Sequence, residues 1–228
     1  DFKNGQSLID LLEALSAAAP EVRLRLGSLE PRTVTEDFCR RAAALPNLCP
    51  QFHLSMQSGC DATLKRMNRK YDTARYLESV ELLNRWFDRP AVTTDLITGF
   101  PEETEEEFGQ TLAFIEECGF AAMHIFPYSK RKGTPAAEMP DQVDEAVKSE
   151  RAARLAKVDE ELHQQMLQST VGKVEEVLFE QPVDDEHMEG LCGPYLRVVV
   201  PGTAELANTI AKVKITGVKE DFLLGELN

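Results

Sequence analysis

The first 130 residues alternate short strand-like runs with longer segments of helical periodicity. Residues 22–26 and 52–56 alternate apolar with polar side chains, and residues 91–98 and 121–126 are mostly apolar. Both patterns are typical of β-strands. Because helical segments separate these runs, we predict an α/β fold with a parallel sheet, arranged as a barrel or as a doubly wound sheet.

Capping residues mark where the predicted helices begin. Thr33-Val-Thr-Glu36 and Thr104-Glu-Glu-Glu107 fit the capping box, in which a hydroxyl and a carboxylate satisfy orphan amides at a helix start. Apolar positions follow helical spacing after Asp72, and again from Phe108 until Cys118-Gly119. One long, charge-rich helix is expected from residue 142 to about 169, and we interpret it as a solvated connecting helix.

Beyond Gly172 the pattern changes to short strand-like runs between Gly, Pro and Asp clusters. These runs are Val174 and residues 177–179, 195–200, 209–215 and 222–224. Their spacing predicts a small all-β barrel. We therefore divide the chain into an α/β part (1–140), a connecting helix (141–170) and a β-barrel (171–228).

Charge and composition narrow the class of protein. Of 228 residues, 43% are hydrophobic. The net charge of −14 argues against a protein whose whole surface binds nucleic acid. No apolar run reaches the length of a membrane helix, so no membrane partner is expected. Five cysteines without CxxC spacing indicate neither a disulfide framework nor a zinc site. We expect a soluble, cytoplasmic protein.

The beginning of the chain carries a further expectation. It starts at Asp1 without Met, and apolar residues between Leu8 and Leu15 already follow helical spacing. A helix of this kind normally packs against preceding structure. We therefore expect this chain to be the C-terminal part of a longer protein.

Four polar loops follow the predicted strands of the α/β part. They are residues 27–31, 57–60, 98–103 and 127–135. Functional groups of parallel α/β folds gather where the strands end, so we expect the binding site there.

Three long strings in this region resemble one family. HLSMQSGCDATLKRMNRKY (from His53), TTDLITGFPEETEEEF (from Thr93) and HIFPYSKRKGTPAAEMPDQV (from His124) are similar to the radical S-adenosylmethionine methylthiotransferases. The resemblance covers essentially the whole chain. It implies a partial radical-SAM (β/α) barrel, with about four of six strands present, followed by a TRAM-like β-barrel that binds RNA.

Within that family, two segments most resemble the branch that acts on N6-threonylcarbamoyladenosine in tRNA. They are RLGSLEP (from Arg25) and QSGC (ending at Cys60). The branches that act on isopentenyladenosine or on a ribosomal protein more typically have serine at the position of Cys60, and they remain the alternative. The implied reaction adds a 2-methylthio group to the adenosine next to the anticodon. The implied partners are the tRNA anticodon stem-loop and an electron donor such as flavodoxin.

The chain departs from the family pattern in two respects. The CxxxCxxC motif and the three cysteines of an auxiliary site are absent, so the ligands of the two [4Fe–4S] clusters expected in a full-length enzyme are not in this chain. This segment alone is therefore expected to be inactive. Glu102 stands where the family usually has a glycine, which would place a charge beside the cofactor.

The resemblance assigns contacts with S-adenosylmethionine to six residues. Glu30 and Arg69 would bind its methionine end, Gln57 and Asp95 its ribose, and Phe126 and Tyr128 would lie near the adenine. Asp95 also stands out without the resemblance, because an unpaired carboxylate inside an apolar strand is costly.

Each assignment has a purely structural alternative. Glu30 could pair with Arg25 or Arg32, Gln57 could stabilise a turn, and Arg69 could belong to a solvated basic face. His53 and His124 are expected to be core or rim residues, and Cys60 a buried, inert thiol. Glu102, Glu103 and residues 105–107 are expected chiefly to complement a helix N-terminus.

RNA binding is assigned by resemblance to the tail. Its net charge is −6, but Arg197, Lys212 and Lys214 are expected to form a basic patch on adjacent strands, with the loop 130–132 adding to it. A barrel that only packs against its neighbour is the alternative. Two rival functions stay open: a metal-independent α/β-barrel enzyme using Asp95 and Glu30 as acid and base, and a non-catalytic RNA-binding or interaction fragment.

Overall fold

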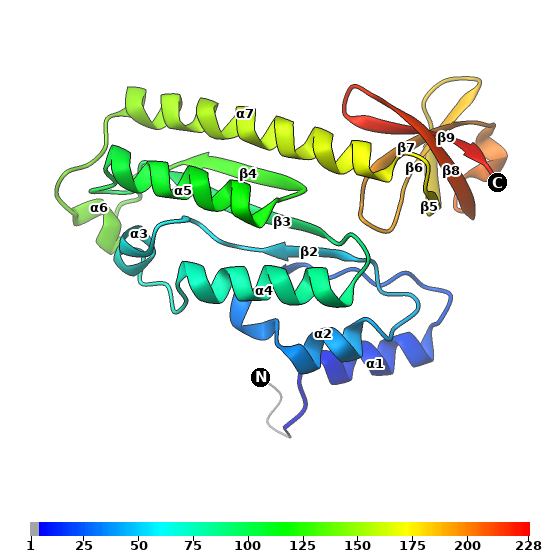
Figure 1. The fold of residues 1–228 in the computed structure, drawn as a ribbon, viewed down its shortest axis with the longest axis horizontal. Helices are drawn as coiled ribbons and strands as arrows, with labels where there is room; N and C mark the ends of the chain where they lie inside the picture. The colour runs from blue at the N-terminus through cyan, green and yellow to red at the C-terminus, as the bar shows by residue number, and fades with distance from the viewer. Residues whose placement is uncertain (1–4) are drawn as a thin grey trace.

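The computed structural model describes residues 5–228. The molecule is elongated, with an α/β layer at one end and a small β-barrel at the other; the long helix α7 (Glu145–Thr170) lies along the α/β layer and reaches the barrel at its C-terminal end (Figure 1). No helix in the described part of the chain is long and apolar enough to cross a membrane.

Four parallel strands form an open sheet in the order β1-β2-β3-β4. They are β1 (Ser28–Leu29), β2 (Gln51–Leu54), β3 (Ala91–Thr98) and β4 (Ala122–Pro127). The connections contain the helices α1 (Leu8–Ala18), α2 (Glu36–Ala42), α3 (Asp61–Arg66), α4 (Thr73–Trp86) and α5 (Glu105–Cys118), and the 3₁₀ turn η1 (Pro31–Thr33). The short helix α6 (Pro135–Glu138) follows β4. The fold is the partial α/β barrel that the sequence predicts.

The two faces of this sheet differ in chemistry because side chains alternate along a strand. One face buries apolar side chains in a core shared with the helices; these include Phe52, Leu54, Val92, Leu96 and Met123. The opposite face carries polar side chains that are partly or fully exposed, among them His53, Thr93, Asp95 and His124. Every cavity described below lies on or beside this polar face.

The first strand differs from the sequence prediction. Residues 22–26 do not form a strand; Leu24 makes only a single bridge with Leu48, and β1 is the two-residue segment Ser28–Leu29. The alternation in residues 22–26 arises from contacts at the domain junction instead. There the Arg23 guanidinium donates to the Leu191 carbonyl at 2.9 Å, and Arg25 stacks over the Tyr195 ring at 3.6 Å.

Two of the predicted helix starts are confirmed and one is wrong. Asp72 caps α4 and Thr104 caps α5, where Thr104 and Glu107 form a complete capping box. The box predicted at Thr33 does not form, because residues 31–33 make the 3₁₀ turn η1. Thr35 is the N-cap of α2 instead, and its hydroxyl accepts from the Phe38 amide.

Helix α7 is not the solvated connector that its charge pattern indicates. It buries Lys148, Arg151 and Leu155 against the end of β3 and the start of α5. Arg151 Nη1 lies 2.8 Å from Glu103 Oε2, which also accepts the Gly99 amide at 2.7 Å. Both charged side chains are nearly fully buried. The expectation that Glu103 chiefly complements a helix N-terminus is therefore wrong.

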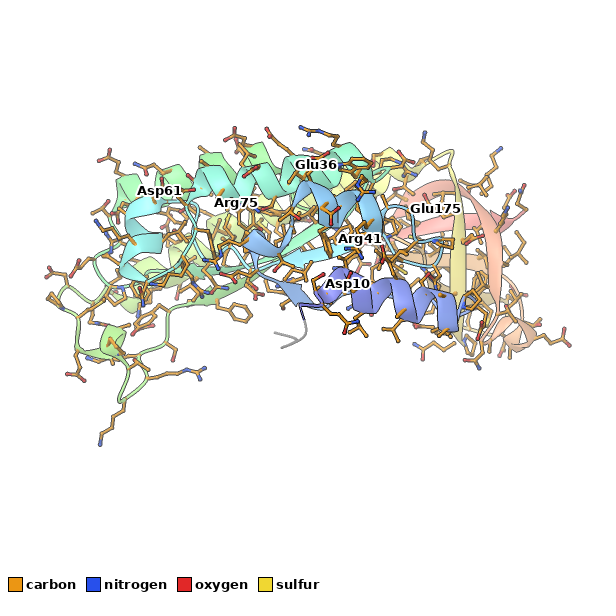
Figure 2. All side chains as sticks on the ribbon, turned by 90° about the horizontal axis from the view of Figure 1, so that it is seen from below. Asp10, Glu36, Arg41, Asp61, Arg75 and Glu175 are labelled. Atoms are coloured by element: carbon orange, nitrogen blue, oxygen red, sulfur yellow. The ribbon has the colours of Figure 1, made fainter. Side chains whose placement is uncertain are left out.

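A second ion-pair cluster joins α1 to α2 at the surface. Figure 2 shows Asp10 and Arg41 beside each other where these helices meet. Arg41 also pairs with Glu13 at 2.6 Å. The hydrogen bond from Arg41 lowers the pKa of Asp10 to about 2, so this carboxylate stays charged at neutral pH.

The tail forms a closed barrel in the strand order β5-β6-β7-β9-β8. The strands are β5 (Val174–Pro182), β6 (His187–Leu191), β7 (Arg197–Pro201), β8 (Ile210–Lys219) and β9 (Phe222–Leu227), with the 3₁₀ turn η2 (Ala204–Leu206). The sequence pattern does not predict β6, because polar residues in this strand interrupt the alternation of apolar and polar side chains. Glycine is required at position 190 of β6 because the backbone of β5 lies very close. A Cβ there would be 2.2 Å from the Leu178 carbonyl oxygen.

We expect Glu103→Gln to destabilise the α/β layer by about 3–5 kcal/mol, because the charge of buried Arg151 loses its partner. Asp37→Asn is the matched control. It breaks surface pairs of the exposed Asp37 with Arg40 and Arg41 and should cost less than about 1 kcal/mol. Urea unfolding followed by the fluorescence of Trp86 in α4 measures both, and equal small effects would contradict the role given to Arg151.

Candidate functional site

A cavity of about 490 Å³ lies where β3 and β4 end. Four of the six residues assigned from sequence line it: Gln57, Asp95, Phe126 and Tyr128. The parallel register explains the convergence, since Asp95 pairs with His124 and Ile97 with Phe126. We call this the strand-end cavity. Arg131 and Thr134 of the polar loop 127–135 also line it, although neither is among the six assigned residues.

Gln57 is held in an unusual backbone conformation. Its φ is +72°, a left-handed value that costs energy for a residue with a Cβ. Its amide donates to the Asp95 carbonyl at 2.8 Å, and its own carbonyl accepts from Ile97 at 2.9 Å. The backbone of Gln57 is thus hydrogen-bonded to β3 at this point, and Gln57 and Asp95 line the same cavity. Strain of this kind is common at ligand-binding sites.

Asp95 has partners on only one of its carboxylate oxygens among the described residues. Oδ2 lies 3.2 Å from His53 Nε2 and accepts from Ser55 Oγ at 3.3 Å. Asp95 lines the strand-end cavity and a second cavity on the other side. The carboxylate is therefore oriented through Oδ2, while Oδ1 is available to a ligand. Sequence reasoning missed Ser55, although it shares the face of His53 by strand alternation.

Tyr128 supplies an unpaired polar atom. Its hydroxyl is buried and has no hydrogen-bond partner among the described residues. The ring packs edge-on against Phe100 with centroids 5.4 Å apart, and Lys148 Nζ of α7 lies 5.3 Å from its centre. A buried hydroxyl without a partner is costly. Because this atom has almost no accessible surface, Tyr128 lines the strand-end cavity through its other atoms.

Glu30 and Arg69 lie apart from the other four residues. They line a smaller cavity of about 290 Å³, together with Ser55 and Tyr71. Glu30 lies 3.9 Å from Arg32, whereas Arg25 is engaged with Tyr195. Since Ser55 also donates to Asp95, the smaller cavity is next to the strand-end cavity.

Glu102 occupies a position that suits glycine. Its φ is +67°, and its amide donates to the Asp141 carbonyl at 3.0 Å. This left-handed conformation explains a preference for glycine without any reference to a ligand. Glu102 is not among the described residues that line the strand-end cavity, and a charge beside the cofactor stays a prediction.

The five cysteines do not fit an iron–sulfur cluster. All are buried, and none belongs to the group of potential metal ligands found among the described residues. Burial raises the pKa of Cys118 and of Cys192 to about 12, so neither is a ready thiolate at neutral pH. Cys60 is buried, as expected.

The basic residues of the tail do not form one patch on adjacent strands. Arg197 lies on β7, and β9 separates this strand from β8, which carries Lys212 and Lys214. Arg197 is also neutralised by Glu189, whose Oε2 accepts from Nε at 2.6 Å. The two lysines are exposed on one face of β8. The loop 130–132 precedes α6, at the opposite end of the molecule from the barrel (Figure 1).

Two sequence models of known families match the chain. The Radical SAM superfamily matches residues 4–115, and the TRAM domain matches residues 168–227. The α/β layer is similar in fold to coproporphyrinogen III oxidase of Escherichia coli, described as a radical SAM enzyme. That similarity has a TM-score of 0.56 at 16% identity, and covers 71% of this chain and 38% of the other. The chain thus combines a partial radical-SAM barrel with a TRAM barrel.

Relatives narrow the class further. The threonylcarbamoyladenosine tRNA methylthiotransferase MtaB of Bacillus subtilis is 38% identical over 85% of this chain and 44% of its own length. Its counterpart from Chlamydia pneumoniae is 36% identical over 100% of this chain and 54% of its own length. The tRNA-2-methylthio-N(6)-dimethylallyladenosine synthase of Acidothermus cellulolyticus is 43% identical over 78% of this chain and 36% of its own length. The chain belongs to the radical S-adenosylmethionine methylthiotransferase family, and it spans about half or less of the length of these relatives.

Proposed function

We propose that this chain forms the S-adenosylmethionine nucleoside site and the RNA-binding module of a tRNA methylthiotransferase. The observation that carries the proposal is the convergence of Gln57, Asp95, Phe126 and Tyr128 on one cavity. Membership of the family implies S-adenosylmethionine and iron–sulfur clusters as cofactors. We infer that two [4Fe–4S] clusters are held by residues outside this chain.

The chemistry of the cavity fits a nucleoside. The ribose offers two hydroxyls, which the free Asp95 oxygen and the Gln57 amide group can bind as acceptor and donor. The adenine presents an aromatic face to Phe126 and polar edges to the neighbouring backbone. Arg69 is suited to the methionine carboxylate and Glu30 to its amino group, in the adjoining cavity. The bound cofactor would supply radical and methyl-transfer chemistry, while these residues orient it and exclude water.

The proposed substrate is N6-threonylcarbamoyladenosine in the tRNA anticodon loop. The RLGSLEP and QSGC segments and the relatives named MtaB favour it. The dimethylallyladenosine synthase of Acidothermus cellulolyticus, at 43% identity, favours the isopentenyladenosine branch as the second candidate. We further infer an external one-electron donor of the flavodoxin type, since reductive chemistry on a cluster needs one.

A segment exchange tests the catalytic proposal. We expect this chain, substituted for the matching segment of the Bacillus subtilis relative, to restore 2-methylthio-N6-threonylcarbamoyladenosine in a strain that lacks the relative. Asp95→Asn in the exchanged segment should lower that product about 10- to 100-fold, because charge-assisted bonds worth roughly 1.5–3 kcal/mol are lost. Mass spectrometry of digested tRNA measures the product.

Asp88→Asn is the matched control, because Asp88 is exposed on the loop that precedes β3, and it should leave the product unchanged. Product formed only on isopentenyladenosine would overturn the proposed substrate and leave the methylthiotransferase class standing. A soluble, cluster-loaded exchange protein that modifies neither nucleoside would contradict the proposal itself.

The RNA-binding role of the barrel is a separate proposal. Lys212 and Lys214 are exposed on one face of β8, whereas Arg197 already has an acidic partner. We expect Lys212→Gln with Lys214→Gln to weaken tRNA binding and to reduce the salt-dependence slope by roughly 1–2. Arg197→Gln should have a smaller effect, and Lys157→Gln on α7 none. Filter-binding titrations at several salt concentrations measure this, and an unchanged slope in the double variant would contradict it.

A further inference from the structure

We propose that His53, Asp95 and His124 form a binding site for a divalent transition-metal ion. One ligand atom from each of the three side chains lies within 4.8 Å of the others. Among the described residues, these three form the group of potential metal ligands that lie this close together. The site does not depend on the proposed function, although Asp95 serves both.

The strand register builds the group. Asp95 is the direct partner of His124 across β3 and β4, and His53 is the partner of Thr93 across β2 and β3. Since Thr93 and Asp95 are two residues apart, they share the polar face of β3. The three side chains therefore project from neighbouring strands on the same side of the sheet.

His53 is oriented as a metal-binding histidine usually is. Its Nδ1 lies 3.0 Å from the Thr93 hydroxyl, which leaves Nε2 directed at Asp95 Oδ2, 3.2 Å away. A hydrogen bond to one ring nitrogen fixes the tautomer and presents the other to the metal. The His124 ring is close by, with its centroid 5.9 Å from that of His53.

The donor set selects the class of ion. Two imidazoles and one carboxylate suit Zn²⁺, Fe²⁺ or Co²⁺, whereas Mg²⁺ and Ca²⁺ prefer oxygen ligands throughout. Three protein ligands leave at least one coordination position open. That position faces a cavity of about 460 Å³, closed on one side by Tyr195 of the barrel and by Arg25. The exposed His124 provides the path of entry.

The two uses of Asp95 occupy different oxygens. Oδ2 faces His53, and the metal would replace that hydrogen bond, while Oδ1 remains available to the strand-end cavity. A metal at this place would hold the carboxylate rigid. His124 lines the cavity of about 460 Å³ and not the strand-end cavity. Its removal therefore tests metal binding without changing the lining of the strand-end cavity.

Calorimetric titration of the 228-residue chain with Zn²⁺, and visible absorption with Co²⁺, test the site. We expect one ion per chain and an absorption spectrum without thiolate-to-cobalt bands, because all five cysteines are buried. His124→Ala should weaken Zn²⁺ binding by at least about tenfold, and Thr93→Val, which removes the orienting hydroxyl, by about 10-fold. Zn²⁺ should raise the melting temperature of the unsubstituted chain and not that of His124→Ala.

His187→Ala is the matched control. His187 also lies beside a carboxylate, Asp184, at 2.9 Å, but on the barrel and outside this group. Its Zn²⁺ affinity should equal that of the unsubstituted chain. If His124→Ala bound Zn²⁺ as tightly as His187→Ala, or if the unsubstituted chain bound none, the proposal would be overturned. In that case His53 would simply be a hydrogen-bond partner of Asp95 and Thr93.

Discussion

The parallel register of β3 between β2 and β4 determines where the sites of the α/β layer lie. Alternation turns Val92 and Leu96 toward the helices and leaves Thr93 and Asp95 on the polar face. A shift by one residue would bury the Asp95 carboxylate in the apolar core, at a large cost in free energy. The same apolar burial that stabilises the sheet therefore fixes where its polar groups meet.

Helix α7 holds the end of β3 in place. Glu103, just beyond that strand, accepts from the Gly99 amide and from Arg151 of α7. Burial raises the pKa of Glu103, so its charge depends on the partner that Arg151 provides. Because Lys148 of the same helix lies over the Tyr128 ring, α7 connects the strand-end cavity to the barrel that follows it. The buried ion pair of Glu103 with Arg151 thus helps to fix α7 beside the strand-end cavity.

Sequence patterns predicted the parts of the molecule that are governed by local periodicity. The strands β2 to β4, the caps of α4 and α5 and a barrel in the tail follow from alternation, capping residues and turn residues. The ion pair of Glu103 with Arg151 joins residues 48 positions apart, and no local pattern distinguishes it from a solvated charge. For the same reason, His53 and His124 look like isolated rim residues until strand pairing brings them together.

Amide NMR spectra of the ¹⁵N-labelled chain, titrated with S-adenosylmethionine, decide whether the strand-end cavity binds the nucleoside of this cofactor. We predict shifts confined to residues 57–58, 95–98 and 126–131 at the strand-end cavity and to residues 28–30 and 68–71 at the adjoining cavity, with smaller shifts in Asp95→Asn. Shifts confined to the barrel, or an unchanged spectrum with the ligand in large excess, would contradict the claim.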